Sequence, residues 1–220
     1  MKAEAEQRVE QPRRPRGACR WGWTIVCIFV AVGAAIALTI ILRKQDEFNV
    51  TEVTCNYEGV RCNGDEKITE IAWSDAKNLQ TIPSELGEFT ELTRLVLSSN
   101  DFTGTIPSTL ASLTALTELR LDKNALTGTL PSVLSSLTKL RVFQVHENQL
   151  RGSIPSEYGD WTDLRTFSVH SNNLTEKLAT EFGRWKKLSS FDVFGNSLEG
   201  TLPEEYGDWE SIETFFVEKN

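Results

Sequence analysis

The chain has 220 residues, with 31 acidic side chains against 23 Lys and Arg, and a formal net charge of −8. This length fits one or two domains. Residues 43–220 hold 17 of the bases and 28 of the acids. So acidic a composition argues against a nucleic-acid partner, because phosphate binding needs clustered Lys and Arg.

The first predicted element is a membrane-spanning helix over residues 21–42, a run of 22 residues without a charge. A helix of this length crosses a hydrocarbon core about 30 Å thick. Trp21 and Trp23 stand where an interfacial aromatic belt would lie. The alternative is a cleaved signal peptide, which usually has a shorter apolar region and a small-residue cleavage site. The long uncharged run favours an uncleaved signal anchor.

The flanking charges predict how this helix is oriented. Four arginines crowd residues 13–20, whereas only Arg43 and Lys44 follow the span. The side richer in Lys and Arg stays in the cytoplasm. We therefore expect residues 1–20 to be a disordered cytoplasmic tail. Residues 43–53 would be a juxtamembrane linker, and all later residues would be lumenal or extracellular. Both the plasma membrane and an internal secretory membrane fit this topology.

Two kinds of covalent modification are expected on that side of the membrane. Cys55 and Cys62 fall where disulfides persist, and their spacing would close a small loop. Asn49 and Asn173 each begin an N-glycosylation sequon.

From residue 68 onward the sequence repeats every 24 residues, as L-x-x-L-x-L-x-x-N-x-L-x-G-x-I/L-P. The first six positions of each row alternate apolar and polar residues, which predicts a short parallel strand. The Asn column predicts a ladder of buried amides that satisfy backbone groups where the strand turns. This column comprises Asn100, Asn124, Asn148, Asn172, Asn196 and Asn220.

Two aromatic columns enter the later rows. Tyr158, Phe182 and Tyr206 form one column, and Trp161, Trp185 and Trp209 form the other. A ligand-stacking surface is one interpretation. We expect core packing instead, because leucines fill the same positions in the earlier rows.

The 24-residue row ending in G-x-I/L-P resembles the plant-type leucine-rich-repeat family. Residues 55–62, CNYEGVRC, resemble the N-terminal cap of that family, with Tyr57 in the place of a Trp. This resemblance covers about residues 54–220. It implies an α/β repeat solenoid, a curved right-handed superhelix with a parallel sheet on its concave face. It also implies a disulfide-closed cap over residues 54–67, repeats over 68–220, and a second, shorter sheet from the G-x-I/L-P segments.

The resemblance does not carry kinase signalling to this chain. The best-known family members are receptor kinases, with the repeats before the span and the kinase after it. Here the predicted span precedes the repeats, and no kinase motif is present in the sequence.

Three rows depart from the pattern. Row 68–91 has Trp73 in an apolar column and Ala76 in the Asn column, so we expect a degenerate first repeat. Row 164–187 has Glu176 for Gly and Ala179 for Pro, so we expect its second strand to be irregular. The last row stops at Asn220 without a polar cap, and repeat arrays need one. We therefore expect the natural chain to continue.

No enzyme signature, cofactor motif or metal-ligand spacing is present, and we expect neither catalysis nor a metal site. Asp122, His146 and His170 share one column and would meet across strands about 4.8 Å apart. We interpret the two histidines as solvated side chains on a polar face.

The expected function is ligand binding on the concave face, where side chains vary from row to row above an invariant core. The candidate binding residues are Arg94, Val96, Glu118, Arg120, Asp122, Gln144, His146, Ser168, His170, Asp192, Phe194 and Phe216. Phe194 and Phe216 are the candidate anchors. The ligand would be a protein, peptide or glycan, and a receptor-like chain without a kinase would signal, if at all, through a co-receptor. The alternative is adhesion or organisation of a surface matrix.

Overall fold

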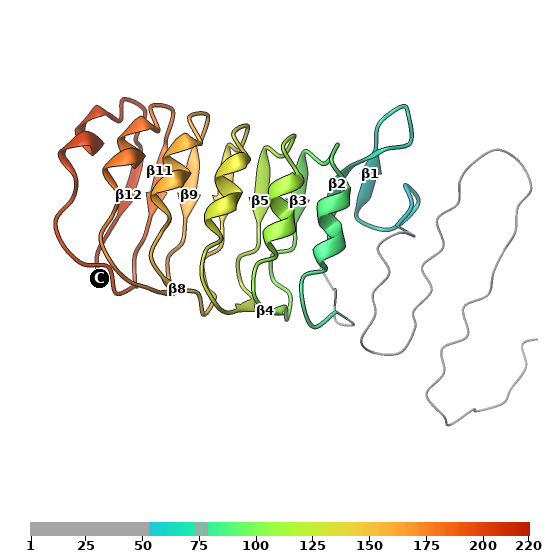
Figure 1. The fold of residues 1–220 in the computed structure, drawn as a ribbon, viewed down its shortest axis with the longest axis horizontal. Helices are drawn as coiled ribbons and strands as arrows, with labels where there is room; N and C mark the ends of the chain where they lie inside the picture. The colour runs from blue at the N-terminus through green and yellow to red at the C-terminus, as the bar shows by residue number, and fades with distance from the viewer. Residues whose placement is uncertain (1–52, 74–75, 77–78) are drawn as a thin grey trace, which may run out of the picture.

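The chain folds as a row of stacked turns that runs from an N-terminal cap to the C-terminus, as the computed structural model shows (Figure 1). The structure describes residues 53–73, 76 and 79–220. The predicted cytoplasmic tail, the predicted span, Asn49 and all of the linker except residue 53 lie outside these residues. Within the described part, no helix is both long and apolar enough to cross a membrane.

One strand from the cap and one from each row form an eight-stranded sheet in the order β1-β2-β3-β5-β7-β9-β11-β12. Only β1 is antiparallel to its neighbour; every later pair is parallel and shifted by 24 residues, as Leu95, Leu119, Phe143 and Phe167 illustrate. The strands are β1 Val60–Cys62, β2 Ile68–Ala72, β3 Arg94–Val96, β5 Glu118–Arg120, β7 Val142–Gln144, β9 Thr166–Ser168, β11 Ser190–Asp192 and β12 Thr214–Phe216. The predicted strand positions and the 24-residue register are confirmed.

The Asn ladder is confirmed, and Asn148 shows how each member works. Its side-chain NH2 donates to the carbonyls of Leu121, Val145 and His146 at 3.0, 3.0 and 3.2 Å. Its Oδ1 accepts from the N–H of Leu126 at 2.9 Å. Each amide therefore ties the end of its own strand to the preceding row. Buried backbone groups need such partners, and here the side chain supplies them.

The core lies between the large sheet and the opposite edge of each row, and the two aromatic columns belong to it as expected. Tyr158, Trp161, Phe182 and Trp185 are fully buried. The indole of Trp161 donates to the carbonyl of Leu134 at 3.1 Å. A Trp in place of Leu therefore adds a hydrogen bond between rows as well as apolar contact.

The expected repeat solenoid with a parallel sheet is confirmed, and in the described residues its helical edge, opposite the large sheet, consists of 3-10 helices and not α-helices. These helices are η2 Ser84–Glu88, η3 Ser108–Ser112, η4 Ser132–Ser136, η5 Ser156–Asp160, η6 Thr180–Arg184 and η7 Glu204–Asp208. Each has five residues, and five of the six follow a proline. After the two strands and their turns, a 24-residue row leaves room for little more than one helical turn.

A second, interrupted sheet runs along one flank of the solenoid. Its strands are β4 Thr103–Gly104, β6 Ala125–Leu126, β8 Arg151–Gly152 and β10 Asn173–Leu174. They pair as β4 with β6 and β8 with β10. The expectation of an irregular second strand near Glu176 is wrong. β10 pairs with β8, and Glu176 adopts the positive φ (68°) that Gly has in other rows.

The N-terminal cap closes one end of the core. Cys55 and Cys62 form the disulfide that the family resemblance implies, with their Cα atoms 5.5 Å apart. The degenerate row 68–91 is a full member of the solenoid, since Trp73 is buried and the N–H of Ala76 donates to Asn100 Oδ1 at 2.8 Å.

Candidate functional site

The candidate site is the concave surface, defined as the outward-facing side chains on and just after the strands of the large sheet. Every candidate binding residue lies in this region, because residues two apart on a strand face the same side and equivalent positions align across the strands. The structure divides the surface into three zones of different chemistry.

The N-terminal zone is a charge ladder formed by Glu70, Arg94, Glu118 and Arg120. Arg94 forms ion pairs with Glu70 and with Glu118, the latter at 2.9 Å, and Glu118 also pairs with Arg120. Burial disfavours the charged guanidinium of Arg94, but the hydrogen bonds to Glu70 and Glu118 outweigh this effect and raise its pKa. A ligand in this zone would have to compete with pairs that already satisfy one another.

The central zone contains the histidine pair, His146 and His170. Their rings stack with centroids 4.3 Å apart and an interplanar angle of 19°. Asp122 Oδ2 lies 3.7 Å from His146 Nε2, and Asp192 Oδ2 lies 3.9 Å from His170 Nε2. The expected meeting of Asp122, His146 and His170 is thus confirmed.

The histidine pair is less exposed to solvent than the sequence suggested. The side chains of His146 and His170 are 14% and 22% exposed. Burial lowers the pKa of His146; the Asp122 carboxylate opposes this shift and His170 reinforces it. Low exposure favours the neutral imidazole at this position.

The C-terminal zone holds the two candidate aromatic anchors, which differ in exposure. Phe216 is 48% exposed. Phe194 is half-buried, and the ammonium of Lys219 lies 5.1 Å from the centre of its ring. Phe216 is therefore the more accessible of the two anchors, and Lys219 would have to move before a ligand could stack on Phe194.

The remaining candidate residues differ in how far they reach the surface. Val96 and Gln144 are half-buried and face outward between rows. Asp122 and Ser168 are buried, at 7% and 5% exposed. Asp122 accepts a hydrogen bond from Ser98 at 2.6 Å, and Ser168 lies 3.2 Å from Nδ1 of His146. These two residues support the surface from below and position its other side chains.

Sequence reasoning missed Glu70, Glu147 and Ser171. Glu70 belongs to the column of Arg94 and Glu118, so the 24-residue spacing contained the signal, but the degenerate row obscured it. Ser171 Oγ lies 3.0 Å from Nδ1 of His170. Glu147 lies beside the histidine pair: one ligand atom from each of His146, Glu147 and His170 lies within 4.8 Å of the other two.

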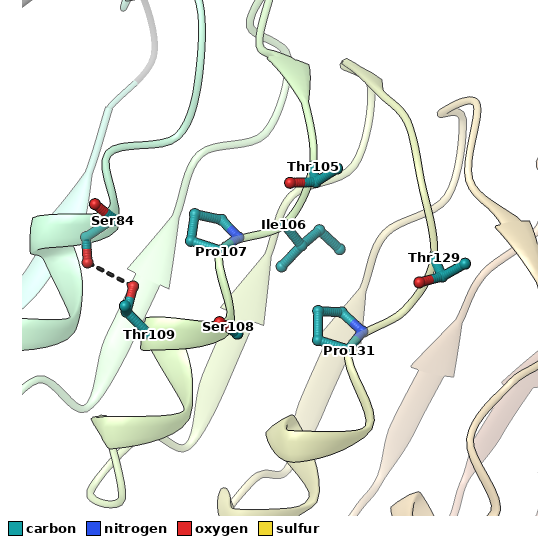
Figure 2. A pocket seen from close by; sticks show the side chains of 8 residues that line it. All are labelled: Ser84, Thr105, Ile106, Pro107, Ser108, Thr109, Thr129 and Pro131. Carbon is teal, nitrogen blue, oxygen red and sulfur yellow. Dashed lines mark hydrogen bonds between the residues drawn. The ribbon is translucent and has the colours of Figure 1, made fainter.

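A hollow of about 450 Å³ lies away from the concave surface, lined mainly by two successive rows, with Ser84 from the row before them. Figure 2 shows Pro107 and Pro131 at corresponding places in these rows, with Thr105 and Thr129 preceding them. Thr109 donates to the carbonyl of Ser84 at 2.6 Å across its edge. No charged side chain lines this hollow. Its shape follows from the repeating geometry of the rows.

The comparisons with known proteins agree with this architecture. Residues 90–150 match the family model for leucine-rich repeats. A comparison with curated proteins found no match.

Several solved structures are similar to the chain. PEPR1, solved with AtPEP1, is 29% identical over 80% of the chain, with a TM-score of 0.69. The LRR ectodomain of the receptor kinase SOBIR1 from Arabidopsis thaliana is 29% identical; the match covers 68% of this chain and 86% of that one, with a TM-score of 0.61. The BIR2 ectodomain from Arabidopsis thaliana is 30% identical; the match covers 66% of this chain and 78% of that one, with a TM-score of 0.59.

The relatives differ greatly in length. The chain spans 25% of the PEPR1 chain, but more than three quarters of the BIR2 ectodomain. The repeat register, the Asn ladder, the disulfide-closed cap and these similarities agree with one another. The chain therefore belongs to the plant-type leucine-rich-repeat family, with a repeat domain similar to the ectodomains of receptor kinases.

Proposed function

We propose that the chain is a membrane-anchored binding module, not an enzyme, whose repeats recognise a protein or peptide through the concave surface. The observation that carries the proposal is the contrast between the core columns and that surface. The core is nearly the same in every row, whereas the surface changes from a charge ladder, to a histidine pair, to exposed Phe216. A surface that varies above a constant scaffold is where repeat proteins place their specificity.

The relatives support a macromolecular partner. PEPR1 was solved together with AtPEP1. Fold alone does not fix function. The charge ladder disfavours a highly charged ligand at the N-terminal zone, since its charges already pair with one another. Gln144 and Phe216 offer an amide and an aromatic ring instead, which suits a peptide of mixed polarity. A glycan would use the same zones.

The proposed topology places the repeats outside the cytoplasm. Residues 1–20 would be cytoplasmic, residues 21–42 would span a plasma or secretory-pathway membrane, and residues 43–53 would link the span to the cap. The uncharged run and its arginine-rich flank support this arrangement. Asn173, an exposed residue at the start of β10, would then be open to glycosylation. A co-receptor would transmit any signal.

Photo-cross-linking tests the binding proposal. A photoreactive phenylalanine analogue replaces Phe216 in one full-length variant and Gln144 in another, both expressed in the native membranes. The control variant carries the analogue at Val133, which is 50% exposed and belongs to η4 on the opposite edge. We expect a discrete adduct from positions 216 and 144, and none from position 133. Adducts of equal yield from all three positions would contradict recognition by the concave surface.

Two further results separate the alternatives. Capture that is weak and requires many copies of the chain would favour adhesion over recognition of one ligand. Topology is tested by treating the full-length protein with a glycosidase. A mobility shift that disappears in Asn173→Gln supports lumenal or extracellular repeats. Removal of the repeats by a protease added to the cytoplasmic side of intact membranes would overturn the topology.

A further inference from the structure

The histidine pair contains every histidine of the chain. The 220 residues include two histidines, and these two stack on each other from adjacent rows. His146 lies two residues after β7 and His170 two residues after β9, so the 24-residue register alone places them side by side. Imidazole is the side chain most often used to bind transition metals.

Both rings are already oriented through Nδ1. His146 Nδ1 lies 3.2 Å from Ser168 Oγ, and His170 Nδ1 lies 3.0 Å from Ser171 Oγ. When Nδ1–H donates to a hydroxyl, the lone pair is left on Nε2. Metal-binding histidines are commonly fixed in this way by a hydrogen bond at the other ring nitrogen. In that tautomer both Nε2 atoms carry a lone pair that can bind a metal ion.

Carboxylates surround these nitrogen atoms without completing hydrogen bonds to them. Asp122 Oδ2 and Asp192 Oδ2 lie 3.7 and 3.9 Å from the nearest Nε2, beyond the usual hydrogen-bond range. Glu147 supplies a third ligand atom within 4.8 Å of one from each ring. In a tetrahedral zinc site with bonds of about 2.1 Å, neighbouring ligand atoms lie about 3.4 Å apart. To bind one ion, Glu147 must rotate, and the two stacked rings must rotate so that their in-plane lone pairs converge on it.

We propose that His146, His170 and Glu147 bind a divalent transition-metal ion of the zinc class on the concave surface. Two imidazoles and one carboxylate suit zinc, copper or nickel better than magnesium or calcium, which take oxygen ligands. Asp122 and Asp192 add negative charge on either side. Because these side chains supply three ligands, a fourth position would be left for water or for an oxygen atom of a ligand. The site does not depend on the identity of that ligand.

The test is a zinc titration of the full-length chain in detergent, purified with a tag that contains no histidine. Because the chain has two histidines, a long-range ¹H–¹⁵N spectrum of the imidazoles contains two ring systems. We expect both rings to shift with one bound zinc ion per chain. His146→Gln and His170→Gln should each weaken binding at least tenfold, and Glu147→Gln should weaken it severalfold. Glu199→Gln, an exposed carboxylate on the flank, is the matched control and should leave affinity unchanged.

Two results would overturn the site. One is that the NMR signals of both imidazole rings stay unshifted at millimolar zinc. The other is binding that persists unchanged in both histidine variants, which would place zinc at other groups such as the cysteines. Thermal unfolding of each variant without metal checks the fold. Since the spectrum of the wild-type chain reports directly on both rings, the result does not depend on any variant being folded.

Discussion

The side-chain oxygen of Asn148 accepts a hydrogen bond from the backbone N–H of Leu126, 22 residues earlier, at 2.9 Å. The same side chain donates to three carbonyls, so one buried amide satisfies four backbone groups in two rows. The side chain is thus part of the backbone hydrogen-bond network of the solenoid.

Asn148→Leu is expected to destabilise the chain strongly. Leu fits the apolar surroundings but leaves the backbone groups unpaired, at roughly 1–3 kcal/mol each. The expected loss in the free energy of unfolding is at least about 3 kcal/mol, measured by urea unfolding of the full-length chain. Gln149→Leu removes an exposed amide from the next position and is the control, with an expected change below about 0.5 kcal/mol. Similar losses in both variants would contradict the role of the ladder.

Gly159→Ala should be much more harmful than Gly207→Ala, although the two glycines occupy the same place in rows that lie two apart. A Cβ at Gly159 would lie 2.7 Å from the carbonyl oxygen of Glu181, whereas one at Gly207 would meet nothing within 4 Å. We expect a loss of about 1–3 kcal/mol for Gly159→Ala and no loss for Gly207→Ala, because Ala reduces the entropy of the unfolded chain. Thermal unfolding of the pair measures the difference, and equal melting temperatures would refute close packing of the 3-10 helices.

Alkaline pH should destabilise the chain through Tyr158. Burial raises the pKa of its phenol well above 10, and Glu157 adds to the shift. Above pH 10 the unfolded chain releases this proton while the folded chain keeps it. Stability is therefore complete below pH 10 and falls above it, by about 1.4 kcal/mol per pH unit for one such group.

Tyr158→Phe isolates this effect. At pH 7 the variant should be less stable by about 1–3 kcal/mol, since the carbonyl of Pro131 loses a hydrogen bond of 3.0 Å. The deficit should shrink between pH 10 and 11, because Phe releases no proton. Urea unfolding at several pH values measures both trends. A parallel pH dependence in the two proteins would contradict the burial argument, and Tyr57→Phe, at an exposed position, serves as the control.

Glu118→Gln tests whether the charge ladder stabilises the fold. Glu118 pairs with two arginines, and its side chain is only 18% exposed. Removing its charge takes one carboxylate partner from each of Arg94 and Arg120, whereas Arg94 keeps its pair with Glu70. We expect a loss of about 1–2 kcal/mol at low salt that diminishes at high salt. Asp160→Asn breaks an exposed pair with Arg184, where both side chains are more than half exposed, and should cost less than about 0.5 kcal/mol. Equal losses would show that the ladder contributes no more than an ordinary surface pair.

The 24-residue register predicted most of the fold, because each row buries the same columns and each column has one structural role. It placed the strands, the Asn ladder, the aromatic core and the meeting of Asp122 with His146. The 3-10 helices were less predictable, since five residues such as Ser156–Asp160 carry too little periodicity to distinguish helix types. Glu176 shows the same limit: its sequence indicates a broken row, but neighbouring rows hold it in the positive-φ conformation.

The candidate surface was predictable in position but not in exposure. The register assigns Phe194 and Phe216 to outward-facing positions, yet Lys219 lies over the ring of Phe194 and leaves Phe216 open. The burial of Asp122 depends on hydrogen bonding to Ser98 in the previous row. Such rotamer choices depend on contacts between side chains in different rows, which a linear pattern does not contain.

The spacing between strands of the large sheet also limits how the concave surface can recognise a bound peptide. Adjacent strands of a sheet lie about 4.8 Å apart, whereas an extended peptide advances about 3.4 Å per residue. In a peptide that lies across the strands, peptide residues and strands therefore align again only after about seven peptide residues, which span about five rows. Identical rows could not recognise a repeating peptide motif position by position. Discrimination between peptide ligands must therefore come from the few rows whose surface side chains differ sharply from those of their neighbours.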